Sequence, residues 1–102
     1  MTPREFLRRR DGLVHALEGG LWLHRFTLEG RPMAHLVSAD RGALLDWGAQ
    51  RGLDPRWIQH KPLRDPRTGT RVPAWHWDLE GELLPARGQA GGTPAGPAGT
   101  EV

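Results

Sequence analysis

The amino-acid sequence predicts one small α+β domain: a short, mainly antiparallel sheet packed on one face by two helices, with a disordered C-terminal tail. Apolar residues alternate with polar ones in some stretches, as in strands, and follow helical spacing in others. Gly and Pro are frequent after residue 80, where the chain has too few apolar groups to offset the entropy of ordering. We therefore expect the domain over residues 1–83 and a Gly/Pro/Ala-rich tail over 84–102.

The first predicted helix begins near the amino terminus. Residues 2–5, Thr-Pro-Arg-Glu, match a capping box with proline at the first helical position. Apolar side chains then recur with helical spacing until Gly19, where two consecutive glycines end the pattern. The pair Asp11-Gly12 weakens the middle of this helix.

A strand hairpin is predicted next. Residues 21–28 alternate with a period of two, which places His24 on the same face as its apolar neighbours Trp22 and Phe26. Residues 29–32 have the composition of a turn, and 33–38 form a second short strand that carries His35. We expect the two strands to pair in antiparallel fashion.

The second helix is predicted over residues 41–51. Ser38 or Asp40 can cap its amino end, and Gly52 stops it. Its apolar stripe consists of Leu44, Leu45, Gly48 and Ala49.

The remaining elements are a turn, a loop and a strand. Asp54-Pro55 restarts a helical turn that is expected to carry Trp57 inward. Residues 61–73 are predicted to be a loop, because Pro, Gly and Arg dominate them. Residues 74–79 form the last strand, in which Trp75, Trp77 and Leu79 face one way and His76 and Asp78 the other.

Composition excludes several classes of protein. The 102 residues include no Cys, which rules out disulfide bonds, cysteine-ligated zinc and thiol catalysis. Helix capping accounts for Ser38, the one Ser, so serine hydrolase chemistry is not expected. The first residues contain no long apolar run that would form a secretory signal or a spanning helix. We therefore expect a cytoplasmic protein that does not contact membranes.

The spacing of His76 and Asp78 is the sharpest chemical feature. Alternate residues of a strand share a face, so this imidazole and carboxylate can act as a catalytic acid–base pair or hold one divalent metal ion. His35 and His60 are the expected further ligands, with His24 as another candidate. The predicted metal residues are therefore His35, His60, His76 and Asp78; the alternative is a surface ion pair.

A second hypothesis rests on the basic middle of the chain. Residues 51–71 include six basic side chains and two acidic ones. Basic groups here could follow a phosphate backbone while exposed Trp rings stack on bases. The alternative is a solvated arginine loop with its Trp residues in the core. The candidate phosphate or nucleic-acid ligands are Arg56, Gln59, Lys61, Arg64, Arg67 and Arg71.

Several short motifs occur in a familiar order: HLVS at 35–38, GL at 52–53, RWIQ at 56–59 and HWDL at 76–79. In this order the chain resembles a family of very short bacterial and phage proteins known only as a domain of unknown function, number four thousand and thirty-one. The resemblance covers residues 22–79. It implies a shared fold and brings no known reaction with it.

The resemblance also implies which candidate residues are retained. If the family has an active site of His and Asp, this chain keeps His35, Gln59, His76 and Asp78. The chain departs from the family's pattern in three places: His24 stands where the family tends to show Asp, Leu45 stands near the place of a helix His, and residues 61–73 look inserted.

The sequence thus favours a His/Asp pocket that binds a divalent metal or a phosphate and hydrolyses a phosphodiester. In this hypothesis the four metal residues hold the ion, and Arg56 and Arg64 neutralise a nucleic acid or a phosphorylated small molecule. Two alternatives stay open: a non-catalytic nucleic-acid-binding module, and an interaction protein that acts through its tail. The sequence pattern does not distinguish an enzyme from a binding protein.

Overall fold

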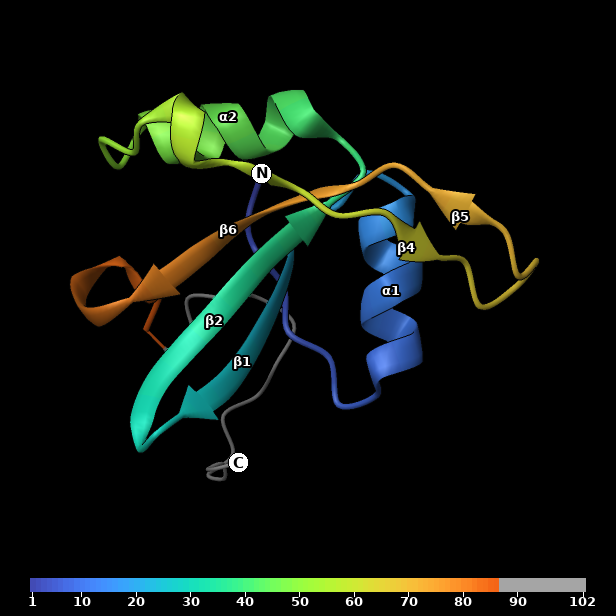
Figure 1. Ribbon diagram of the computed structural model, residues 1–102, viewed down its shortest axis with the longest axis horizontal. Helices are drawn as coiled ribbons and strands as arrows, with labels where there is room; N and C mark the ends of the chain where they lie inside the picture. Colours follow the sequence, from blue (N-terminus) through green and yellow to red (C-terminus); the bar gives the residue numbers. More distant parts are fainter. Residues whose placement is uncertain (87–102) are drawn as a thin grey trace.

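The structure, a computed structural model, describes residues 1–86 and confirms the α+β class (Figure 1). It contains a mainly antiparallel four-stranded sheet in the order β1-β2-β6-β3 and a separate pair, β4-β5. Most of the predicted tail, residues 87–102, lies outside the described residues. The elements are α1 (Arg9–Leu17), β1 (Trp22–Leu28), β2 (Arg31–Ser38), α2 (Arg41–Ala49), η1 (Pro55–Trp57), β3 (Gln59–His60), β4 (Leu63–Arg64), β5 (Arg71–Val72), β6 (Trp75–Glu80) and η2 (Gly81–Leu83).

The centre of the sheet is the predicted hairpin of β1 and β2, with β6 added to the other side of β2. Both pairs are antiparallel. The hairpin turns through Glu29 and Gly30, whose φ angles of 52° and 81° are the left-handed values of a two-residue turn. The turn is therefore shorter than expected, and β2 begins at Arg31.

The two helices pack against opposite faces of the sheet, and not on one face as the sequence suggested (Figure 1). On one face α2 covers Leu36 and Trp77, neighbours across β2 and β6. On the other face Ala16 of α1 covers Trp22 and Val37. Because both faces of the strands carry large apolar side chains, each face needs its own cover.

Helix α1 begins at Arg9, so the prediction of a start at residues 2–5 is wrong. Arg4 instead lies beside β1: its N–H donates to the Leu21 carbonyl at 2.9 Å, and its carbonyl accepts from the Leu23 N–H at 2.8 Å. These two hydrogen bonds pair backbone groups at the edge of the sheet that would otherwise lack partners. The stabilisation from this pairing exceeds that of the local capping pattern. Gly12, which was expected to weaken the helix, lies within α1. Its lack of a side chain lets the Trp22 ring pack directly against the helix, since an added Cβ would overlap that ring.

Of the two predicted caps of α2, Ser38 and Asp40, the structure shows Asp40, whose carboxylate accepts from the Ala43 N–H at 3.0 Å. Ser38 does not cap the helix: its hydroxyl oxygen accepts from the Asp40 N–H at 2.9 Å. The contact of α2 with the sheet depends on Gly48, where an added Cβ would lie 2.5 Å from Cζ2 of Trp77. The Trp77 indole also donates to the Leu44 carbonyl at 2.8 Å. Trp47, which was absent from the predicted stripe, is buried beside them.

Residues 61–73 are not simply a loop. They contain the β4-β5 pair, with Leu63 opposite Val72 and packed toward the cluster under α1. Arg67 joins this hairpin to the end of α1 through an ion pair with Glu18 at 3.0 Å. The hairpin is therefore a part of the folded domain.

Candidate metal site

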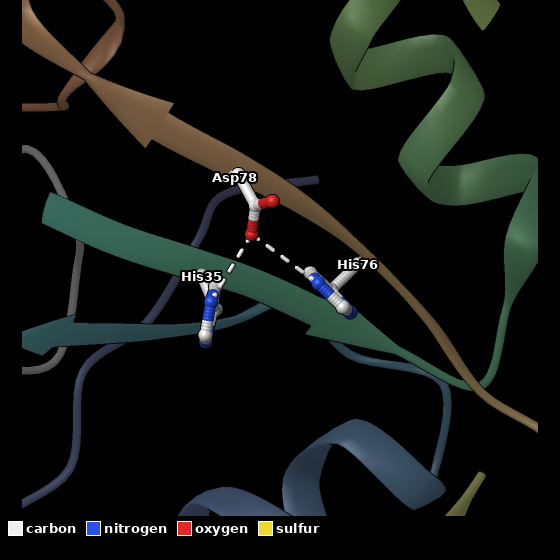
Figure 2. A group of neighbouring side chains, drawn as sticks. All are labelled: His35, His76 and Asp78. Carbon is white, nitrogen blue, oxygen red and sulfur yellow. Dashed lines mark ion pairs between the residues drawn. The ribbon is translucent and has the colours of Figure 1, made fainter. Parts of the chain in front are cut away.

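Three predicted site residues meet on the sheet face that also carries α1. His35 of β2 lies directly opposite Asp78 of β6, and His76 is two residues before Asp78, so all three side chains project from one face. Oδ1 of Asp78 lies 3.1 Å from Nε2 of His35 and 3.2 Å from Nε2 of His76 (Figure 2). One ligand atom from each residue falls within 4.8 Å of the others.

The second oxygen of Asp78 is held by Gln59. The Gln59 side-chain amide donates to Oδ2, while Oδ1 faces the two imidazoles. Strand β3 makes this contact possible, because it places Gln59 opposite His76. Such an outer hydrogen bond fixes the orientation of a carboxylate ligand.

Both imidazoles favour the neutral form. Burial is the main cause that lowers the pKa of His35 and of His76 below 6.5. The positive charge of Lys61 lowers both pKa values further, and the charge of Asp78 opposes this in part. Since a metal binds the neutral imidazole, the burial and the cation leave both rings ready to act as ligands near neutral pH.

The three residues differ in exposure. The side chain of His76 is 10% exposed, whereas those of His35 and Asp78 are 38% and 44% exposed. The site is therefore anchored at His76 and open to solvent at Asp78. His24 continues the row beyond His35, with ring centroids 6.4 Å apart, but it does not join the group of three.

His60 does not belong to this site, so its predicted role as a ligand is corrected. It lies opposite Trp75 in the β3-β6 pair, and the two rings are 5.3 Å apart. Alternation along β3 and β6 puts Trp75 and His60 on the face opposite Gln59 and His76. The sequence could not reveal this, because no pattern in it predicted that residues 59 and 60 form a strand paired with β6.

The predicted phosphate ligands are dispersed. Arg56 pairs with Asp54 at 2.7 Å, and Arg67 pairs with both Asp65 and Glu18. Arg64 donates to the carbonyl of Gly69 at 2.7 Å and lies across from Arg71. Two of the six candidates interact with the His/Asp group: Gln59 donates to Asp78, and the charge of Lys61 lowers the pKa values of His35 and His76.

A cleft of about 480 Å³ adjoins the site at the edge of the sheet, lined by Leu53, Trp57, Gln59, Trp77, Asp78 and Leu83. Strand β3 pairs with β6 only as far as His76, and the cleft lies beyond that point. The prediction that Trp57 points inward is wrong, since this residue is 61% exposed. No local pattern marks Trp57 as the exposed tryptophan, so the sequence did not reveal the cleft.

The lowered histidine pKa values predict a pH-dependent stability. Burial is the first cause that lowers the pKa of His15, His24, His35 and His76 from 6.5. On acidification the unfolded chain therefore takes up protons that the folded chain does not. The stabilisation is complete above pH 6.5 and is lost as the pH falls through the lowered values.

Urea unfolding of the metal-free protein between about pH 7.5 and pH 5 measures this effect, since carboxylates titrate mainly below that range. We expect the free energy of unfolding to decrease steadily as the pH is lowered from about 7.5 to about 5. A free energy of unfolding that does not change over this range would contradict the lowered pKa values of the four histidines.

No family model, curated protein or solved structure matches the chain. The resemblance to the domain of unknown function therefore stays a prediction. None of the helices in residues 1–86 has the length and apolar character needed to cross a membrane.

Proposed function

We propose that the protein binds a divalent metal ion through His35, His76 and Asp78 and uses it to hydrolyse a phosphate ester. The convergence of two imidazole nitrogens and one carboxylate oxygen within 4.8 Å is the observation that carries this proposal. Two neighbouring strands hold these groups, so little ordering is needed when an ion binds.

The ligand set favours zinc as the first ion to test. Catalytic zinc sites commonly use three protein ligands of nitrogen and oxygen and leave one position open. Two His and one carboxylate can also hold ferrous iron, which is the natural comparison. The exposure of Asp78 and His35 supports an open position on the solvent side.

The charges near the site support an anionic substrate. Lys61 lies close enough to lower the pKa values of both His35 and His76, and it has no ion pair among those described in residues 1–86. A divalent ion would polarise a phosphoryl oxygen and promote deprotonation of a water molecule. The water oxygen would form a bond to phosphorus, the bond from phosphorus to the ester oxygen would break, and the departing alcohol would take up a proton.

The test combines metal analysis with a hydrolysis assay. Protein incubated with zinc and then dialysed is expected to retain one ion per chain by elemental analysis and to hydrolyse bis(4-nitrophenyl) phosphate. Asp78→Asn keeps the shape of the side chain but removes its charge, and it should lose both properties. Absence of bound zinc, manganese and iron, together with no hydrolysis when these ions are added, would reduce the group to a surface ion pair.

The nucleic-acid hypothesis has weaker support. Arg56 and Arg67 are engaged in ion pairs within the fold. The exposed tryptophan, Trp57, belongs to η1, whereas the hairpin of β4 and β5 lies beside α1, away from that turn (Figure 1). The arginines and the ring therefore do not form one continuous track.

A further inference from the structure

The cleft beside the metal site has two chemically different ends. Leu53, Trp77 and Leu83 contribute apolar surface, and Gln59 and Asp78 contribute an amide and a carboxylate. Asp78 is common to the cleft and to the His/Asp group. A molecule that fills the cleft would therefore contact Asp78 at its polar end, next to the two imidazoles that pair with the same carboxylate.

Trp57 gives the apolar end a flat, accessible wall. At 61% exposure it is the most exposed Trp or Phe of residues 1–86. The turn that carries it is held by Asp54, whose carboxylate accepts from the Arg56 N–H at 2.9 Å. A ring on a fixed turn loses little conformational freedom when another planar group stacks on it.

The size and charge of the region narrow the class of ligand. A volume of about 480 Å³ lies within the range of pockets that take small molecules. Lys61 is near both imidazoles, and a bound divalent ion would add positive charge beside Asp78. The polar end thus suits an anion, and the other end suits a flat apolar group.

We propose that the cleft binds the planar aromatic group of a phosphate ester, which stacks on Trp57 while its phosphate lies toward His35, His76 and Asp78. The inference rests on the proposed function for the placement of the phosphate. Stacking on Trp57 does not require the metal. Two sources share this chemistry, a nucleotide and a simple aryl phosphate.

Calorimetric titrations of the zinc-loaded protein with adenosine monophosphate, phenyl phosphate and inorganic phosphate test the proposal. Both aromatic esters should bind more tightly than inorganic phosphate, and Trp57→Ala should weaken them roughly tenfold, the scale of one stacked ring. A preference for the nucleotide identifies a base-sized ligand, and a preference for phenyl phosphate identifies an aryl ester. Leu28→Ala, at an exposed apolar residue outside the cleft lining, should change neither affinity.

Adenosine titrated into the metal-free protein separates the two proposals. If adenosine binds and Trp57→Ala abolishes this binding, the aromatic site stands even when no metal is retained. If zinc binds but Trp57→Ala leaves all three affinities unchanged, the aromatic site is overturned while the metal site remains. An unchanged zinc affinity in Trp57→Ala would show that the variant is folded.

Discussion

Substitution of His76 by Ala is expected to lower zinc affinity by more than about 100-fold, because loss of even an outer partner of a metal ligand commonly costs 10- to 100-fold. His76 is the most buried member of the group, with a side chain that is 10% exposed. Its imidazole would be replaced by a methyl group that offers no ligand atom. Competition titration against a chelator of known zinc affinity measures the change, and phosphodiester hydrolysis should be lost with it.

His60→Ala is the matched control for this experiment. His60 lies on β3, which pairs with β6, the strand that carries His76. Its ring, however, contacts Trp75 on the opposite face of the sheet. Zinc affinity in this variant should stay within about threefold of the wild type. A factor of this size corresponds to the effect of about 0.5 kcal/mol that is usual for a surface substitution. Equal losses in His60→Ala and His76→Ala would contradict the assignment of the site.

Substitution of Trp77 by Ala is expected to lower the free energy of unfolding by about 3–5 kcal/mol, the usual cost of removing a buried large aromatic side chain. Trp77 is 2% exposed and belongs to the main core cluster. Its ring fills the space left by Gly48, and its indole N–H is bonded to the Leu44 carbonyl. The variant would therefore lose packing, a hydrogen bond and the contact of α2 with the sheet.

Urea denaturation of the metal-free proteins at neutral pH measures this loss. Trp57→Ala removes the same side chain from an exposed position, and its effect should lie within about 0.5 kcal/mol, as is usual for surface substitutions. Similar destabilisation by the two substitutions would show that the core does not depend on Trp77 in the way described.

Local patterns in the sequence were sufficient for the parts of the fold in which each residue's neighbours are close in the chain. The alternation of 21–28, 33–38 and 74–79 predicted β1, β2 and β6, three of the four strands of the sheet, and which of their side chains share a face. Asp40 was a correct cap because its partner, Ala43, is three residues away. The same alternation correctly placed His76 and Asp78 together.

The errors arose where distant segments compete for the same partner. A capping pattern at residues 2–5 predicted a helix, but the open edge of β1 takes up the backbone of Arg4 instead. Both helices were expected on one face because the sequence does not show which apolar surface each one covers. The loop over 61–73 contains a hairpin that is held by contacts with α1 and with Glu18.

The sequence by itself determined that one strand presents an imidazole and a carboxylate side by side, since alternation is a property of a single strand. Only the tertiary structure decided which other residues join them. The antiparallel register of β2 and β6 brings His35 opposite Asp78, and the two-residue pairing of β3 brings Gln59 in while it turns His60 away. Strand register depends on packing and hydrogen bonds between segments far apart in the chain, and a slip of one residue would move every side chain to the other face.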